Sequence, residues 1–176
     1  MKFSAELLKD FDLSPQDEKE PVNVMKISEM LDFLKQTAER IHNKSQLFQS
    51  TSDANIQLDC MDIVTTKLND FVQVFRDIII FMRIQEGTHK DITSLRYCIT
   101  SYDTFPFNQT ENEKLFLQEL LLRNEITHDY FNRELHQQKL VWLMQNCSDG
   151  ALDVYYNLQN YCVEYQLLEL YANKTR

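Results

Sequence analysis

Glycine and proline are scarce in this chain of 176 residues, which contains only 2 Gly and 3 Pro. A β-rich fold of this size needs many tight turns, and these two residue types supply many of them. Long elements joined by few sharp turns are therefore expected. Hydrophobic residues make up 43% of the chain and charged residues 26%, which is typical of a globular domain with a sizeable core. The sequence predicts an all-α fold.

Long apolar runs are also lacking. No stretch approaches the roughly 20 consecutive apolar residues that a membrane-spanning helix needs. The first six residues, Met1–Glu6, contain no apolar signal core and turn acidic at once. We therefore expect a protein that stays in the cytoplasm and does not contact a membrane.

Cysteine is sparse and widely scattered, at Cys60, Cys98, Cys147 and Cys162, with no CxxC pair. A zinc site or a disulfide framework would require closer or more regular spacing. None of the four histidines lies in an HExxH or other metal-ligand pattern. The expectation is reduced cysteines in or near the core, with no metal and no cofactor.

Basic residues are outnumbered by acidic ones, with 18 Lys and Arg against 27 Asp and Glu, so the formal net charge is −9. A protein that coats nucleic acid needs many Lys and Arg residues against phosphates, so this class is disfavoured. A small RNA cleft with local positive charge remains open, and so does a basic protein partner.

The pattern of apolar residues divides the chain into two parts. Residues 1–25 combine a short apolar patch with an acidic stretch and two prolines, which predicts an N-terminal acidic arm or short helix. Residues 26–176 are predicted to form one helical bundle domain. Its first helix, from residue 26, has a stripe made of Ile27, Met30, Leu31, Leu34, Ala38, Ile41 and Phe48. Its second helix, about 54–84, has a stripe made of Ile56, Cys60, Ile63, Phe71, Phe75, Ile78, Ile79 and Met82.

Shorter helices are predicted farther along the chain, at about 88–102, from about 111, at 134–146 and at 151–172. Thr110 and Glu113 have the spacing of a capping box, which marks the start of the helix at about 111. Two long helices followed by shorter ones predict an antiparallel bundle.

The segment with candidate chemistry is Arg123-Asn124-Glu125-Ile126-Thr127-His128-Asp129-Tyr130, in which Arg is followed after four residues by His and then, one residue later, by Tyr. About 0.007 such matches are expected by chance from this composition. On a continuing helix, Arg123 and Tyr130 are seven residues apart and nearly eclipse. Asn124 and His128 are four residues apart and can touch. The other histidines, His42, His89 and His136, are expected to be ordinary surface or half-buried residues.

On a continuing helix, the face that carries Arg123, Asn124, His128 and Tyr130 would offer a fixed cation, an amide, a titratable imidazole and a phenol. His128 can exchange a proton near neutral pH, and Arg123 can hold a phosphate through two hydrogen bonds. Together they could cleave RNA without a metal, with a second copy supplying the proton for the leaving group. The alternative is structural: Arg123 pairs with Glu119, while His128 and Tyr130 cap the end of the helix.

The motif Arg-Asn-x-x-x-His-x-Tyr resembles the RX4HXY signature of HEPN proteins of the HepT type, which are partners of small MntA-type nucleotidyltransferases. The resemblance extends loosely over residues 26–146, and it implies a HEPN-type antiparallel helical bundle. It implies that Arg123 and His128 are the ribonuclease pair, with Asn124 as a supporting catalytic residue. It also implies a homodimer, and it makes Tyr130 the residue that a nucleotidyltransferase antitoxin would modify with AMP.

Three functions are left open by the sequence. The first is a HEPN toxin-like, metal-independent ribonuclease in a toxin–antitoxin pair, silenced through AMPylation of Tyr130. The second is a non-catalytic helical module that docks a nucleotidyltransferase or binds its substrate. The third is a structural helical adaptor in which the motif arises by chance.

Overall fold

The computed structural model describes residues 23–86, 110–126 and 133–164. These residues form five helices and no strand, so the predicted all-α class is confirmed. In chain order the helices are α2 (Asn23–Ser50), α3 (Ala54–Glu86), α5 (Glu111–Ile126), α6 (Arg133–Asn146) and α7 (Gly150–Glu164). Residues 1–22, the helix predicted at about 88–102 and the end of the last predicted helix lie outside the described residues. None of the described helices is long and apolar enough to cross a membrane.

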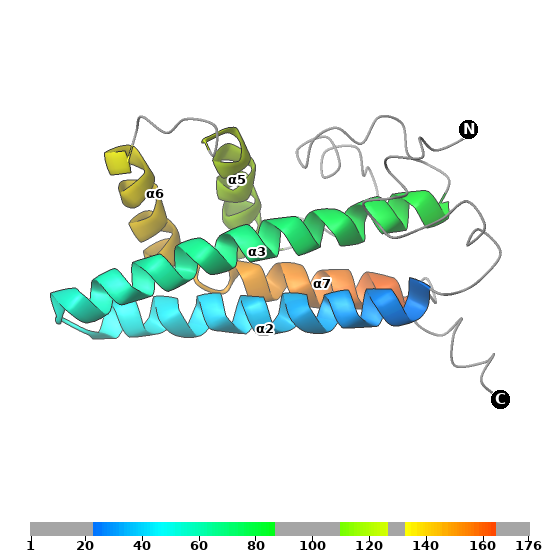
Figure 1. Ribbon diagram of the computed structural model, residues 1–176, viewed down its shortest axis with the longest axis horizontal. Helices are drawn as coiled ribbons and strands as arrows, with labels where there is room; N and C mark the ends of the chain where they lie inside the picture. The colour runs from blue at the N-terminus through cyan, green and yellow to red at the C-terminus, as the bar shows by residue number, and fades with distance from the viewer. Residues whose placement is uncertain (1–22, 87–109, 127–132, 165–176) are drawn as a thin grey trace.

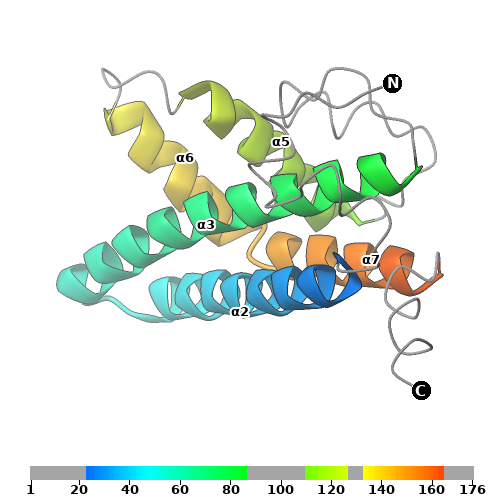
Figure 2. The same ribbon diagram turned by 45° about the vertical axis from the view of Figure 1, so that its right-hand side comes forward.

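The helices are arranged as a layer with a crossing pair. The long helices α2 and α3 run antiparallel and form the most extensive contact between elements, and α7 lies along α2 (Figure 1). The helices α5 and α6 stand across this layer and run in opposite directions, as the turned view also shows (Figure 2). α5 therefore begins against the layer and projects away from it.

The turn between α2 and α3 is short, and Asp53 caps the second helix. Its Oδ1 accepts hydrogen bonds from the backbone N–H groups of Asn55 (2.8 Å) and Ile56 (3.3 Å). A side-chain oxygen in this position satisfies donors that the first turn of a helix leaves unpaired. The two helices were expected from their apolar spacing, whereas this cap was not identified in the sequence.

The apolar stripe predicted for α2 is buried, apart from Met30, which is half-buried. On α3 the prediction of Ile56 as a core residue is wrong, since this side chain is 39% exposed. Ile56 lies in the first turn of α3, next to the tip of the hairpin, where α2 has already ended. Val64 and Leu68, which the predicted stripe omitted, are fully buried in its place.

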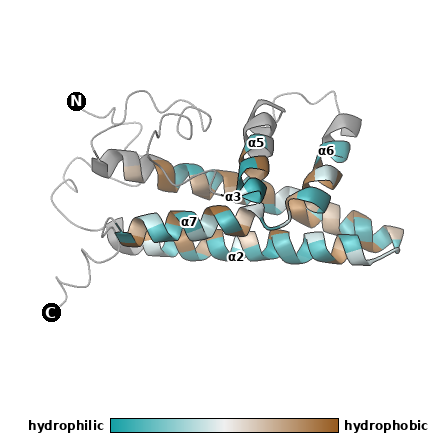
Figure 3. Cartoon of the chain, turned by 180° about the vertical axis from the view of Figure 1, so that it is seen from behind, coloured by the Kyte–Doolittle hydropathy of each residue, from teal (hydrophilic) through white to brown (hydrophobic). Residues whose placement is uncertain are grey.

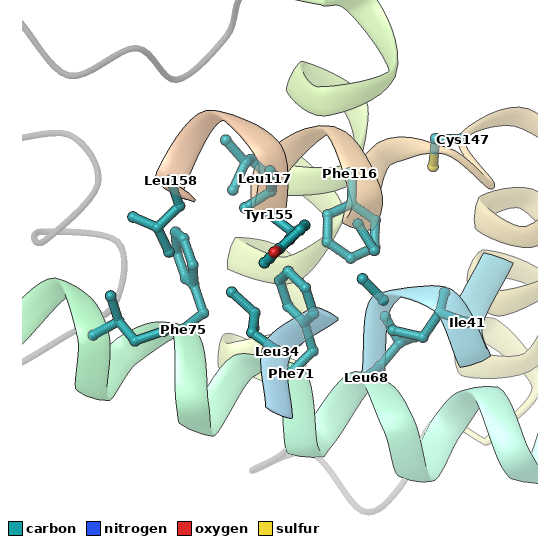
Figure 4. Packing of buried hydrophobic residues seen from close by; sticks show 14 of the residues in the cluster. Leu34, Ile41, Leu68, Phe71, Phe75, Phe116, Leu117, Cys147, Tyr155 and Leu158 are labelled. Atoms are coloured by element: carbon teal, nitrogen blue, oxygen red, sulfur yellow. The ribbon is translucent and has the colours of Figure 1, made fainter. Parts of the chain in front are cut away.

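Aromatic side chains join α3 to α5 at the centre of the core (Figure 4). The ring of Phe71 meets that of Phe116 edge to face, with centroids 5.3 Å apart, and lies 6.0 Å from the ring of Phe75. Such pairs contribute about 0.5–1.5 kcal/mol beyond the area they bury. By contrast, the side of α2 turned to the viewer in Figure 3 is mostly hydrophilic. The core thus lies between α2, α3 and α7 and extends to α5 and α6.

Candidate functional site

Helix α5 carries the first part of the candidate motif. Arg123 and Asn124 belong to its last turns, because α5 is described from Glu111 to Ile126. Their side chains, together with His128 and Tyr130, lie outside the described residues. The helical placement of Arg123 and Asn124 agrees with the sequence analysis. The approach of these two residues to His128 and Tyr130 stays a prediction.

The other end of α5 is fixed by the predicted cap. Thr110 Oγ1 accepts a hydrogen bond from the backbone N–H of Glu113 at 3.0 Å, which confirms the capping position. The same hydroxyl donates to Asp153 Oδ2 of α7 at 2.6 Å. One side chain therefore caps α5 and ties it to a second helix.

A buried carboxyl group adds a second tie between α5 and α7. Glu113 is fully buried, and its Oε2 accepts a hydrogen bond of 2.7 Å from Asn157 Nδ2. Removal of a charged or polar group from water is costly unless it is hydrogen-bonded, so such a group is held in one geometry. The sequence spacing identified Glu113 only as part of a cap, and nothing in it pointed to Asn157, 44 residues away.

Gly150, the first residue of α7, lets this helix approach α5 closely. A Cβ atom added at Gly150 would lie 2.3 Å from Phe116 Cβ and 2.7 Å from the backbone oxygen of Asn112. Both distances are far below van der Waals contact, so only glycine fits here without a shift of α5. The cap, the buried carboxyl and this close contact together fix the end of α5 that faces the layer.

The turn between α6 and α7 is held to α2 by polar side chains. His42 Nδ1 lies 2.9 Å from Asp149 Oδ1. Gln46 Nε2 donates to Ser148 Oγ at 3.2 Å. One turn farther along α2, Gln49 Nε2 donates to the carbonyl of Met144 at 2.6 Å. His42 is half-buried, as expected, but its partner was not foreseen.

His89 lies outside the described residues, and so does the side chain of His136 on α6. Within the described segments, no three His, Cys, Asp or Glu side chains are grouped so that they could hold a metal ion. Cys60, Cys147 and Cys162 are buried, which confirms the place in or near the core that was predicted for them.

One described phenol has a perturbed pKa. Burial raises the pKa of Tyr155 on α7, and the nearby charges of Asp32, Tyr156 and Glu39 raise it further in that order. A raised pKa makes this phenol a weaker acid than an ordinary tyrosine, and its ring belongs to the buried core cluster.

Comparison with known proteins gives no family assignment. No family model matches the chain, and neither the curated proteins nor the solved structures contain a match. The resemblance to HEPN proteins therefore depends on the motif and on the helical order of the chain.

Proposed function

We propose that this protein is a HEPN-type, metal-independent endoribonuclease, silenced by a small nucleotidyltransferase of the MntA type. The observation that supports the proposal is the sequence Arg123 to Tyr130, whose Arg and Asn occupy the last turns of a helix in an all-helical bundle. The end of α5 that carries Arg123 and Asn124 projects away from the layer of long helices (Figure 1).

The proposed reaction uses the RNA itself as the nucleophile. His128 removes the proton from a 2′-hydroxyl, and that oxygen attacks the adjacent phosphorus. Arg123 donates hydrogen bonds to the phosphate oxygens and stabilises the charge that develops there. The bond to the 5′-oxygen breaks as this oxygen takes up a proton, which leaves a 2′,3′-cyclic phosphate and a 5′-hydroxyl. Since His128 has taken a proton, the donor in this step is the His128 of a second copy.

The proposed silencing step is transfer of AMP from ATP to Tyr130. The phenol oxygen attacks the α-phosphorus, pyrophosphate leaves, and the phenol proton passes to solvent. On helical spacing the AMP phosphate would then lie beside the Arg123 guanidinium, because the two residues are seven positions apart. It would occupy the position that the RNA phosphate needs.

The α5–α7 contact supports this proposal from the opposite end of the helix. A site works best on an element whose position is fixed by packing and by hydrogen bonds. α5 has both near Thr110, Glu113 and Gly150, while its other end carries Arg123. The buried contact thus gives the proposed site a rigid support.

The proposal is tested by RNA cleavage with the purified full chain in the presence of EDTA. General acid–base catalysis supplies roughly 10²–10⁴-fold, so His128→Ala and Arg123→Ala should each lose activity by about this factor. Their helical circular dichroism and melting temperature should stay close to wild type. His136→Ala is the matched control and should remain active. Full activity of His128→Ala would refute the catalytic assignment.

AMP transfer is tested separately, by the intact mass of the chain after co-expression with an active nucleotidyltransferase. One AMP should be added to the wild type and none to Tyr130→Phe. An unmodified wild-type chain would contradict the silencing mechanism but not the cleavage chemistry.

The net charge of −9 favours a second candidate function, a non-catalytic module that docks a nucleotidyltransferase. An acidic surface attracts a basic protein and repels RNA. If the wild type never cleaves RNA but binds a nucleotidyltransferase, this second function replaces the first, and Arg123 and Tyr130 become contacts for the partner.

A further inference from the structure

One side of α2 carries two basic side chains between two apolar ones that reach solvent. Phe33 is 44% exposed and Leu47 is 39% exposed. Between them, Arg40 is exposed and Lys44, one turn farther on, is half-buried. At about 100° per residue, these four side chains fall within an arc of about 60°. They form a single row along the helix, called the basic row here.

The two cations of the basic row have no partner among the described residues. No ion pair or hydrogen bond joins the side chain of Arg40 or Lys44 to any residue that the structure describes. No Asp or Glu lies three or four positions from either of them on α2, whereas Lys35 has Asp32 and Glu39 at these distances. Like charges four residues apart on a helix repel each other. An acidic group placed against the row would offset this repulsion and add ion pairs.

We propose that the first 22 residues of the chain fold back along α2 and bind the basic row. This segment contains six acidic and three basic residues, so it holds a third of the net charge of −9 in an eighth of the length. It also contains the apolar residues Phe3, Leu7, Leu8 and Phe11. The segment therefore offers acidic groups to the two cations and apolar groups to the two exposed apolar side chains.

The segment is long enough to reach the row. α2 begins at Asn23, and at 1.5 Å per residue Phe33 lies about 15 Å and Leu47 about 36 Å along the helix from that point. Residues 12–22 join Phe11 to α2, and these eleven residues span up to about 36 Å at roughly 3.3 Å per residue. Phe11 and the acidic residues beside it can thus reach the middle of the row.

The small size of the row favours a segment of the same chain over a separate partner. A stable complex between two proteins buries about 1,200–2,000 Å² of surface. Two partly exposed apolar side chains and two cations supply much less than this. A tethered segment, by contrast, is present at an effective concentration in the millimolar range, so a weak contact is enough to hold it.

This inference goes beyond the proposed function, because the basic row contains no residue of the segment from Arg123 to Tyr130. Ribonuclease activity in a chain whose first 22 residues do not bind α2 would refute the inference alone. Binding of these residues in a chain without ribonuclease activity would refute the function alone.

The first experiment treats the full chain with a carbodiimide, which joins a carboxylate to a lysine amine in contact with it through an amide bond. We expect mass spectrometry to find Lys44 joined to an acidic residue between Glu6 and Asp12. Lys44→Arg keeps the charge but has no amine, so this cross-link should disappear. In a mixture of isotope-labelled and unlabelled chains, both sides of the cross-link should carry the same label. Mixed labels, or no cross-link from Lys44 to this segment, would overturn the proposal.

A second experiment measures how fast a lysine-specific protease cuts the full chain after Lys9, a bond that binding should protect. Arg40→Glu should raise the rate of cleavage roughly fivefold, because an ion pair becomes a repulsion. Lys35→Glu is the matched control, since it makes the same change of charge on α2 about 140° around the helix from Arg40. Circular dichroism should show the same helical content in both variants. Equal rates for Arg40→Glu and Lys35→Glu would refute the basic row as the binding surface.

The apolar part of the contact is tested in the same assay. Phe33→Ala should raise the rate of cleavage roughly fivefold, because the apolar side chains of the segment lose their contact with the ring. Tyr156→Ala is the matched control: Tyr156 is also an exposed aromatic residue, at 50%, but it belongs to α7. A rate that is the same for Phe33→Ala and the wild type would show that no apolar contact is made at this position.

Salt tests the charged part of the contact without any substitution. The screening length falls from about 30 Å at 0.01 M salt to about 3 Å at 1 M. Cleavage after Lys9 should therefore become faster as sodium chloride is added, relative to cleavage of a short peptide with the same sequence around Lys9. An unchanged ratio over this range would refute a contact that depends on Arg40 and Lys44.

Discussion

Two polar contacts hold the start of α7, and they differ in how deeply they are buried. The α5–α7 contact, made by Thr110, Glu113 and Gly150 with their partners, contains a fully buried carboxyl and leaves no room for a Cβ atom. The contact between α2 and the α6–α7 turn pairs His42, 28% exposed at its side chain, with Asp149, 52% exposed. Water competes for the second contact, whereas the carboxyl of Glu113 is shielded from water, so the Glu113–Asn157 hydrogen bond and the His42–Asp149 pair should differ severalfold in their contributions to stability.

The largest effect is expected from Gly150→Ala, which breaks the buried contact by steric overlap. The new Cβ would meet both Phe116 Cβ and the Asn112 backbone oxygen at less than 3 Å. Overpacking of this kind costs about 3 kcal/mol of unfolding free energy. Urea denaturation should show this as a lower midpoint. Ser148→Ala, two residues earlier, removes only an exposed hydrogen bond and should stay within about 0.5 kcal/mol of wild type.

The next effect is expected from Glu113→Ala, which removes a partner without overlap. The half-buried Asn157 would lose its 2.7 Å acceptor, and the carboxyl removed is itself fully buried, at a cost of about 2 kcal/mol. Glu113→Gln, which keeps an acceptor oxygen, should lose less. Glu111 is exposed in the same turn, so Glu111→Ala is the control and should change stability by under about 0.5 kcal/mol. Equal losses for Glu111→Ala and Glu113→Ala would show that the burial of Glu113 has no energetic weight.

These two substitutions also mark the limit of what the sequence predicts. The capping spacing of Thr110 and Glu113 correctly located the start of α5, because a cap is a local pattern. Nothing in the sequence pointed to Gly150 as a packing position. Its contact with Phe116 depends on how two helices meet, and no local pattern encodes that.

Apolar periodicity predicted α2 and α3 but misplaced part of the α3 stripe. A helical stripe indicates a buried face, yet whether its first turn is covered depends on where the neighbouring helix ends, as Ile56 shows. For the candidate site, the sequence correctly placed Arg123 and Asn124 on a helix. The roles of His128 and Tyr130 stay predictions, because catalysis depends on side-chain geometry and on a partner copy rather than on spacing alone.

A smaller effect is expected at the exposed contact. A double-mutant cycle of His42→Ala and Asp149→Ala, followed by urea denaturation, should give a coupling energy of about 0.5 kcal/mol, typical of partly exposed pairs. The coupling should shrink as salt is raised, since an exposed pair is screened. A coupling as large as the loss from Glu113→Ala would remove the distinction between the two contacts.

The smallest change in unfolding free energy at neutral pH is expected from Tyr155→Phe. This substitution tests a third contact of α7, the one that it makes with α2. Tyr155 is buried, and its raised pKa arises first from that burial and then from the charges of Asp32, Tyr156 and Glu39. Folding therefore favours the protonated phenol, while the unfolded chain ionises near its ordinary pKa of 10.0. The resulting stability is complete below pH 10.0 and is lost as pH rises through the higher folded-state pKa.

Unfolding free energy measured in urea at a series of pH values should thus fall for the wild type above this point, and the fall should be shallower for Tyr155→Phe. Tyr156→Phe is the control, because Tyr156 is 50% exposed and only the third cause of the raised pKa, so most of the fall should remain. An identical alkaline fall in Tyr155→Phe and the wild type would show that the burial of this phenol, unlike that of Glu113, does not couple ionisation to the packing of α7.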